Sequence, residues 1–346
     1  GVINSDLDEY RYDIEIQDTY IYSPTLTFVT GVSFRRDEVR SETYFNGYLK
    51  NDTSRVFASA TWQATQNANL HLGMMAEQES DADLVFAPRA ALNYKLSPSQ
   101  SVRMVYSESV RSPDLFEQDA FWQLMVENAQ ATVPLNGTTY FQTQQGPSNL
   151  DHQFIRSYEL GYYGRLDYLN SELDVRVFEE NLTDVYYQSL TLDDIETING
   201  ISMQFKGVEW QYTTSPWDDG QLRWVGAYVD AGSNLKGENA DREQVLLRIY
   251  AKNTHTLSWL QRWNEDTSSS VSYILANEYD DLNVDKDDRS LIERVDMKLI
   301  HNIALPRHSL ELSANLQHDI ASDPYIWGDN VYERDTRLQL AARINF

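Results

Sequence analysis

Hydrophobic and polar positions alternate along most of the chain, in short runs separated by polar stretches. In the run from Thr53 to Ala64, one face carries Val56, Ala58, Ala60 and Trp62. A period of two is typical of a β-strand with one apolar face. No window approaches 18 apolar residues, so the pattern predicts no transmembrane helix.

Short turns join these runs into hairpins. We place the turns at residues 22–24, 65–68, 97–100, 168–170, 215–220, 264–266 and 306–307. Longer polar stretches connect one hairpin to the next, and we expect loops at 36–52, 79–83, 111–153, 278–289 and before 332. Short turns at one end of the strands and long loops at the other are typical of outer-membrane barrels. A propeller or a sandwich has no reason to sort its loops in this way.

The pattern predicts about fifteen strands, including one over residues 246–263, and a mixed segment at 181–200 with room for its own hairpin. The last strand places Leu340, Ile344 and the terminal Phe346 on one face, which looks like the assembly signal of bacterial outer-membrane proteins. We therefore predict an all-β fold, a transmembrane antiparallel β-barrel. Single-chain bacterial barrels close with an even number of strands. Either one strand is missed near 181–200, or the chain begins partway through a barrel, which fits the absence of a signal peptide at its start.

The amino-acid composition limits the classes of protein to which the chain can belong. The formal charge of −25 argues against nucleic acid and against a polybasic grip on anionic lipid. The absence of Cys excludes disulfide scaffolds, thiolate metal sites and Cys nucleophiles. The 22 Tyr, 12 Phe and 8 Trp, at a mean hydropathy of −0.54, suit a half-polar barrel with aromatic girdles. Composition alone leaves a soluble sandwich or propeller open.

Catalytic and metal-binding patterns are weak. The six His are scattered, with no HExxH and no nucleophile elbow, so we do not expect an enzyme. The acidic run at 278–288 alternates like a calcium loop. However, Asp288 stands where Gly is required and Arg294 replaces the bidentate Glu. We expect a solvated or lipopolysaccharide-bridging loop there, and no metal site.

Several short motifs resemble those of one family. They are Pro88-Arg89 entering a strand, Arg111-Ser112-Pro113 followed by Glu117, the segment SYELG at 157–161, and the aromatic C-terminus. In this order and spacing they resemble the barrel of TonB-dependent outer-membrane receptors, over essentially the whole chain. That family builds a 22-stranded barrel around an N-terminal plug that TonB pulls. The resemblance implies that residues 1–346 are one barrel domain, incomplete at the N-terminus. The plug, the TonB-contacting segment and about seven strands would lie outside it, so residues 1–346 would not contain the parts that couple the family's transport to TonB.

The resemblance implies a receptor in the outer membrane of a Gram-negative bacterium that takes up a scarce ligand, and we expect a ferric siderophore. Its partners would be outer-membrane lipid and lipopolysaccharide, and TonB-ExbB-ExbD through the plug. Haem receptors of the family carry a His in the long loop. None lies between Asp114 and Ser148, so haem is disfavoured and no cofactor is expected. The alternatives are a plugless passive porin and a structural or adhesive barrel without transport.

The long loop and the lumen supply the candidate ligand contacts. Trp122, Tyr140 and Phe141 suit a ligand with apolar and hydrogen-bonding parts. Arg103 and Arg176 are expected to face the lumen. A loop that merely contains aromatic residues is an equal alternative for the first group. For the two arginines, a hydrogen-bonded network with Glu159 that holds the wall is the favoured alternative.

Overall fold

The fold is described from a computed structural model of the chain. The structure describes residues 6–80, 82–125, 139–147, 149–167, 170–188, 197–233, 250–279, 290–321 and 336–345. The chain packs as two compact units, each described by itself. Unit 1 comprises Gly1–Leu92, Val105–Tyr158 and Glu180–Met203, and unit 2 comprises Asn93–Met104, Glu159–Glu179 and Gln204–Phe346.

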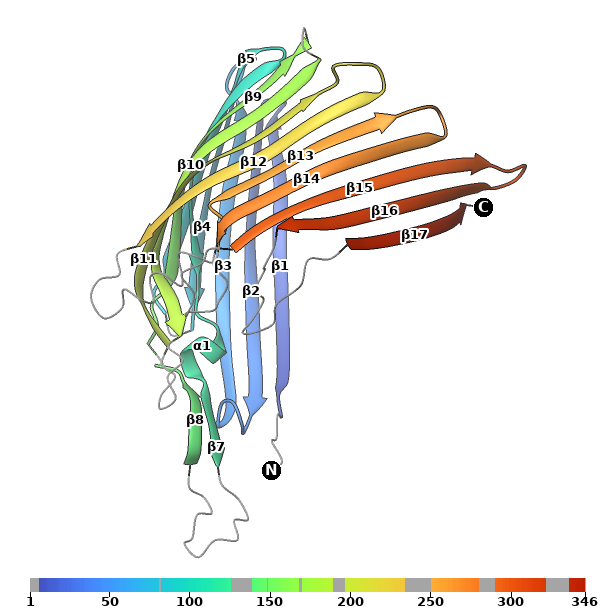
Figure 1. The fold of residues 1–346 in the computed structure, drawn as a ribbon. Coiled ribbons are helices and arrows are strands. Elements are labelled where there is room, and N and C mark those ends of the chain that lie inside the picture. The colour runs from blue at the N-terminus through green and yellow to red at the C-terminus, as the bar shows by residue number, and fades with distance from the viewer. Residues whose placement is uncertain are drawn as a thin grey trace, which may run out of the picture. The chain divides into compact units, whose positions relative to one another are not determined.

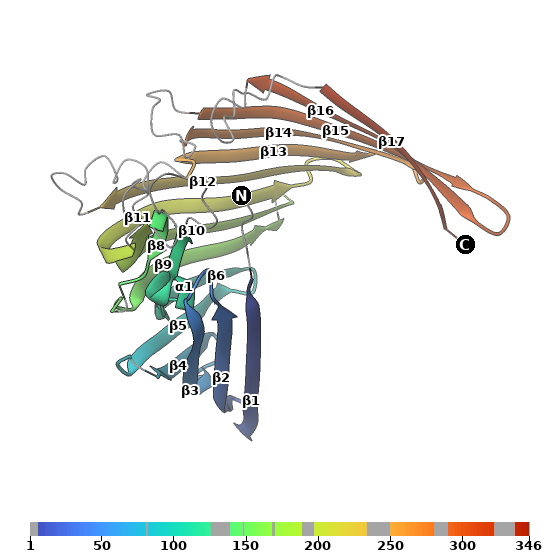
Figure 2. The same cartoon turned by 90° about the horizontal axis from the view of Figure 1, so that it is seen from below.

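Fifteen of the described strands form one antiparallel sheet, which confirms the expected class and strand number. Strands adjacent in the sheet are adjacent in the chain, except that β6 pairs with β9. The first strands are β1 (Asp8–Ser23), β2 (Leu26–Ser41), β3 (Gly47–Gln63), β4 (Ala68–Glu79), β5 (Val85–Ser97) and β6 (Gln100–Arg111). The next are β9 (Gln153–Leu166), β10 (Ser171–Gln188), β11 (Thr197–Thr214) and β12 (Gly220–Ser233). The last are β13 (Asn253–Arg262), β14 (Thr267–Tyr279), β15 (Ser290–Ala304), β16 (Ser309–Ala321) and β17 (Thr336–Asn345), which lie side by side in Figure 2.

Each short turn that the sequence predicts lies within two residues of its expected place. The connections between consecutive strands at these places comprise residues 24–25, 64–67, 98–99, 167–170, 215–219, 263–266 and 305–308. We call the strand ends that meet at these turns the turn ends, and the opposite ends the loop ends.

The expected loop at residues 36–52 is wrong. There β2 continues to Ser41 and β3 begins at Gly47, so the connection is a tight turn. Asn46 and Gly47 have φ values of 54° and 129°, a region that Asn and Gly enter most readily. The stretch reads as a loop because it is polar. Its polar side chains instead pair across the two strands, as Arg36 does with Asp52.

Other expectations also need correction. Residues 111–153 are not irregular throughout, because they include the helix α1 (Leu115–Asp119) and a hairpin of β7 (Phe121–Met125) and β8 (Thr139–Gln145). Residues 181–188 belong to β10 and 197–200 to β11, so the described part of that segment adds no further strand. In the expected strand at 246–263, residues 250–252 are not extended and 246–249 lie outside the described residues.

One face of the sheet is apolar and solvent-exposed. Between β2 and β3, the facing pairs Phe28–Ala60, Val32–Val56 and Phe34–Ser54 lie on it. Exposed apolar stretches of this kind need a covering phase, which is lipid for a barrel wall. The opposite face carries pairs such as Arg55 with Glu77. We call the two sides the apolar face and the polar face.

The apolar face has the height of a bilayer core. On β3 it runs from Trp62 to Asp52, ten positions apart. At about 3.3 Å per residue and a tilt of about 40°, ten positions span about 25 Å, the height of the apolar band in such barrels. Tryptophans cluster near the turn ends, within five residues of a turn: Trp62, Trp210, Trp217, Trp224, Trp259 and Trp263. Among the described residues, no helix is long and apolar enough to cross a membrane.

The apolar face gives a direct test of membrane insertion. Val56→Arg places a charge near the middle of the band and should lower the free energy of unfolding in lipid vesicles by about 2–4 kcal/mol. Ser59→Arg, on the polar face of the same strand, should change it by less than about 1 kcal/mol. Equal losses in urea titrations of the two variants would contradict this assignment of the faces.

Candidate ligand-binding site

A cavity of about 520 Å³ lies in unit 1, between the polar face of β1–β3 and the segment that enters the long loop. We call it the loop-foot pocket. The lining residues that matter here are Arg11, Arg35, Asp37, Phe45, Asn51, Ser112 and Phe116. Figure 1 shows α1, β7 and β8 gathered at the loop ends of β2 and β3.

Two arginines share one carboxylate in this pocket. Arg11 Nε lies 2.5 Å from Asp37 Oδ1, and Arg35 Nε lies 2.9 Å from Asp37 Oδ2. The sheet dictates this arrangement, because Arg11 faces Asp37 directly and Asp37 faces Asn51. Two guanidinium groups against one carboxylate leave one positive charge at this point, and the carboxylates of Glu9, Glu38 and Asp114 also line the cavity. The Arg11 side chain is 65% exposed, so it can reach an anionic ligand without leaving its strand.

The foot of the long loop is fixed to the wall. Ser112 Oγ donates to Glu77 Oε1 at 3.1 Å, and Glu77 also pairs with Arg55. The Tyr186 hydroxyl donates to the carbonyl of Asp151 at 2.7 Å and lies 3.4 Å from that of Arg111. Since Arg111 and Asp151 stand at the two ends of the loop, Tyr186 holds both ends together.

Helix α1 begins with a capping box. Asp114 Oδ1 accepts the Glu117 backbone N–H at 2.7 Å, and Glu117 Oε2 accepts the Asp114 N–H at 3.0 Å. Glu117 also pairs with Arg111 at 2.7 Å. These bonds satisfy the first backbone donors of a helix too short to be stable alone.

An aromatic cluster joins α1 and β7 to the β2–β3 turn. Tyr44 packs against Phe116 and Trp122, with ring centroids 6.4 Å and 5.2 Å apart, and Phe45 packs against Phe116 at 6.0 Å. The Phe121 N–H donates to the carbonyl of Tyr44 at 2.8 Å. The pocket therefore has an apolar aromatic wall opposite its arginines.

The structure brings only part of the predicted site to this place. Trp122 is in the aromatic cluster. Tyr140 and Phe141 are in β8, where Phe141 faces Leu124, and their side chains lie outside the described part. Nothing in the structure tests a ligand contact by any of the three.

Arg103 and Arg176 are in unit 2, in an ion network on the polar face. Arg176 donates to Glu209 at 2.9 Å and lies 3.4 Å from Glu159, while Arg103 lies 4.0 Å from Glu159. These contacts tie four strands, β6, β9, β10 and β11. This is the wall-holding network that the sequence analysis favoured, and a ligand-binding role for the two arginines stays a prediction.

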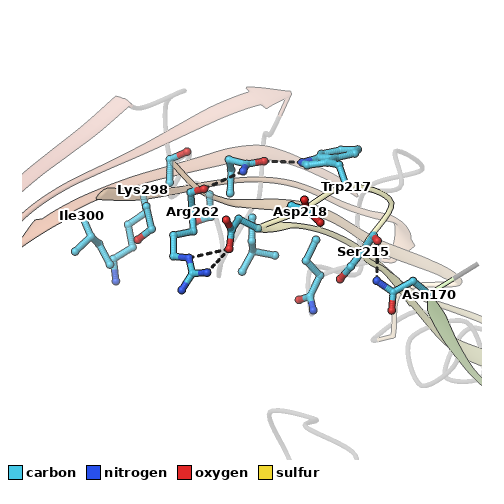
Figure 3. Close-up of a pocket in the computed structure, with 15 residues that line it drawn as sticks. Asn170, Ser215, Trp217, Asp218, Arg262, Lys298 and Ile300 are labelled. Carbon is cyan, nitrogen blue, oxygen red and sulfur yellow. Dashed lines mark hydrogen bonds and ion pairs between the residues drawn. The ribbon is translucent and has the colours of Figure 1, made fainter. Parts of the chain in front are cut away.

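A second cavity, of about 640 Å³, lies at the turn ends of unit 2 (Figure 3). Arg262 pairs with Asp219 there, and Trp217 donates to Gln261 at 2.7 Å. Lys298 and Ile300 line the same cavity. Gly220 is required at this place, because a Cβ would lie 1.9 Å from the Trp217 indole nitrogen. This cavity has no aromatic pair around its cations, so it is a weaker candidate for a ligand with aromatic parts.

Sequence reasoning missed Arg11, Arg35, Asp37 and Asn51. The available signal was their alternation: residues 35 and 37 share a face, opposite the apolar Phe34. This alternation was not used because residues 36–52 were expected to form a loop, and a loop assignment does not assign residues to faces. Among the described residues, no group of acidic and His side chains is arranged to hold a metal ion. The acidic run at 278–288 lies almost wholly outside those residues.

A sheet with a bilayer-high apolar face, a polar face rich in ion pairs and ordered loop ends defines the wall of a transmembrane β-barrel. The family model "TonB dependent receptor-like, beta-barrel" matches residues 3–317. The chain belongs to this family, as its sequence motifs predict.

Solved structures agree on the fold. The siderophore receptor PirA from Pseudomonas aeruginosa is 12% identical with a TM-score of 0.68, over 98% of this chain and 56% of that one. PirA from Acinetobacter baumannii is 9% identical with a TM-score of 0.68, over 91% and 52%. The ferric-catecholate import receptor Fiu from E. coli K12 is 12% identical with a TM-score of 0.60, over 89% and 50%. The chain thus spans about half the length of these receptors. The comparison with curated protein sequences found no match.

Tyr186 provides a test of the loop foot. Tyr186→Phe removes the hydroxyl that holds Asp151 and Arg111, and should cost about 1 kcal/mol. We expect faster hydrogen exchange at residues 111–119 and 150–152 but an unchanged rate in β13–β16. Tyr158→Phe, whose hydroxyl takes no part in the loop foot, is the matched control. Uniformly faster exchange across the sheet would contradict a local role.

Asp6 makes the β2–β3 turn sensitive to acid. Its carboxylate accepts Thr43 Oγ1 at 2.6 Å and the Glu42 N–H at 3.1 Å, and these bonds lower the pKa of Asp6. A lowered pKa in the folded state means that the contribution is complete above the ordinary value of 3.8 and is lost as pH falls through the folded pKa. Hydrogen exchange at residues 42–46, compared with Asp6→Asn at each pH, should therefore differ at pH 7 and 5 and converge in stronger acid. A difference that persists in strong acid would exclude this role.

Proposed function

We propose that this chain is the barrel of an outer-membrane receptor of a Gram-negative bacterium, which takes up a ferric siderophore. The observation that carries the proposal is the loop-foot pocket, which places two arginines and an aromatic wall beneath an anchored loop. Anionic iron chelates with aromatic groups could use the guanidinium groups for their oxygens and the aromatic wall for their rings. Membership of the family and the matched siderophore receptors support it.

The ligand class follows from the pocket chemistry. A guanidinium group donates in a planar fork that suits catecholate or carboxylate oxygens. Trp122, Tyr140 and Phe141 are proposed as further contacts from the loop. A bound haem is disfavoured, because the loop between Asp114 and Ser148 has no His to ligate its iron.

Transport requires partners beyond the barrel wall. We propose coupling to TonB-ExbB-ExbD through a plug domain of the kind the family carries, which would lie outside these 346 residues. Outer-membrane lipid and lipopolysaccharide would surround the apolar face. Leu340 and Ile344, exposed on that face of β17, would belong to the assembly signal with Phe346, which lies outside the described residues.

The second candidate function is a passive porin, which needs an open lumen. Liposome swelling with small sugars separates the two. A plugged receptor should be nearly silent, whereas an open barrel of this size should swell the vesicles rapidly. The intact mass of the protein taken from its native membrane would then show whether a plug accompanies the 40.0 kDa described by this sequence.

The pocket arginines give the sharpest test of the ligand. Arg11→Gln with Arg35→Gln removes both cations and leaves Asp37 facing the ligand. Each charge-assisted hydrogen bond contributes about 1.5–3 kcal/mol, so the Kd of the full-length protein for ferric enterobactin should rise at least about tenfold. Asp37→Asn removes the competing carboxylate and should lower the Kd.

A control separates a local effect from a general loss of charge. Arg223→Gln removes a polar-face cation of unit 2, bonded to Gln211 at 2.8 Å, and should leave the Kd unchanged. If the unmodified protein binds no ferric chelate but swells liposomes, the porin is the correct function. If all three variants bind equally well, the ligand site lies elsewhere.

A further inference from the structure

Among the described residues, four cross-strand ion pairs lie on the apolar face. Three are near a loop end, and the Lys206–Glu179 pair is about halfway along β10 and β11. We call them the outer ion pairs. Unit 1 contains Arg36–Asp52 and Arg156–Glu108, whose closest atoms are 2.6 Å and 2.8 Å apart. Unit 2 contains Lys206–Glu179 and Lys252–Asp230, at 3.6 Å and 3.8 Å. Each pair joins two strands that are neighbours in the sheet, or the ends of two such strands.

The strand period places these pairs on the apolar face. Asp52 follows Ser54 and Val56 at intervals of two. Glu108 stands two positions after Tyr106, whose ring packs against Tyr158 at 5.3 Å. In unit 2, Glu179 and Asp230 likewise follow Val177 and Tyr228, which are exposed apolar side chains: Val177 46% and Tyr228 39%. Alternate residues of a strand share a face, so each acid continues an apolar stripe.

Their repetition needs a physical reason. An ion pair in water contributes about 0–1 kcal/mol, so water gives no cause for ion pairs to recur on this face. A charge facing a bilayer costs about 2–4 kcal/mol at the midplane and about 0–1 kcal/mol at the interface. Ion pairs at the ends of the apolar stripes would therefore lie at the depth of the lipid headgroups, where the energetic cost of a charge becomes small.

The cations retain donors for another partner. Lys206 and Lys50, which stands opposite Glu38 on the same face, are both 53% exposed, and an ammonium group has three donors. Arg156 uses Nε for Glu108 and is 54% exposed, so its terminal nitrogens stay accessible. A carboxylate leaves each of these cations partly unsatisfied.

The turn ends are chemically different. The apolar face there carries a neutral pair, Thr267 with His301 at 2.9 Å. Trp263 donates to Ser269, two positions after Thr267 on β14, at 2.8 Å. Neutral hydrogen-bonding groups and indoles suit an interface of uncharged or zwitterionic headgroups.

We propose that the outer ion pairs are binding sites for phosphate-bearing lipid headgroups in the leaflet at the loop ends. Each cation is shared between its carboxylate and a lipid phosphate, and the carboxylate keeps the cation in place when the lipid exchanges. The proposal depends on the barrel spanning a membrane and not on the ligand that the receptor transports.

Removing the cations and removing the acids of these pairs should change the affinity for an anionic lipid in opposite directions. Arg36→Gln with Lys50→Gln removes cations, and about 1 kcal/mol per cation corresponds to about fivefold in affinity for an anionic lipid. Asp52→Asn with Glu38→Gln removes acids and should raise that affinity several-fold. A merely structural pair would respond in the same direction to the loss of either half.

The measurement uses the full-length protein in phosphatidylcholine vesicles with about one fifth phosphatidylglycerol. Because this chain has no Cys, Phe34→Cys provides a label site in unit 1 next to the outer ion pair. Quenching by doxyl-labelled phosphatidylglycerol relative to doxyl-labelled phosphatidylcholine reports the lipid preference, and high salt should abolish it. Arg223→Gln, on the polar face, is the control that should not change it.

Opposite shifts in the two variants support the proposal, and equal or absent shifts overturn it. If a β2–β3 variant does not insert, Lys206→Gln and Glu179→Gln repeat the comparison in unit 2, with the label at Val177→Cys. A preference for phosphatidylglycerol that is unchanged in both units would show that the pairs only hold neighbouring strands together.

Discussion

The whole structure depends on one constraint: a backbone that crosses lipid must satisfy its N–H and C=O groups within the protein. This chain does so by pairing each strand of the main sheet with a neighbour, and the unbroken register from Asp8–Arg40 to Thr19–Val29 in β1–β2 illustrates it. Once the backbone is paired, the side-chain period of two leaves no freedom about which residues meet lipid. The apolar and polar faces are consequences of that pairing.

Beyond the lipid, a strand no longer needs an apolar face. The loop ends of β2 and β3 show which side chains take its place. Above the apolar band β2 and β3 continue for several residues, now with mostly polar side chains on both faces. On the apolar face these positions carry the Arg36–Asp52 pair, and on the polar face they line the loop-foot pocket. One extension of a hairpin therefore supplies both a surface for headgroups and a wall of the candidate site. The aromatic cluster around Tyr44 and Phe116 ties the long loop to this extension, which gives the pocket a fixed floor.

The parts that could be predicted from the sequence are those governed by local chemistry. The turns around Pro24, Pro98 and Pro306 follow from turn residues between alternating runs, and the structure has strands on either side of each. The extension at 36–52 could not be recognised, because polarity there arises from position above the membrane and not from irregular backbone. Helix α1 is too short to give a periodic hydrophobic pattern. The spacing of Asp114 and Glu117, which form its capping box, is the one sequence feature that could have indicated it. The pocket joins β1, β2 and the start of α1, so it depends on pairing and loop packing that no single segment reveals.

The acidic composition suggests at first that the chain should repel the anionic partners proposed for it. Charge acts over short distances, however, since the Debye length is about 8 Å at physiological ionic strength. A ligand in the loop-foot pocket would meet Arg11 and Arg35 around Asp37, within a lining that also holds other carboxylates. A lipid phosphate beside β3 would meet Lys50 and Arg36 next to Asp52. The total of −25 therefore describes how the molecule behaves toward remote charges, whereas binding at each site is decided by the few groups within a screening length. The net charge argues against a nucleic-acid surface, which would need a broad basic field, but it leaves room for local sites where a few cations face an anion.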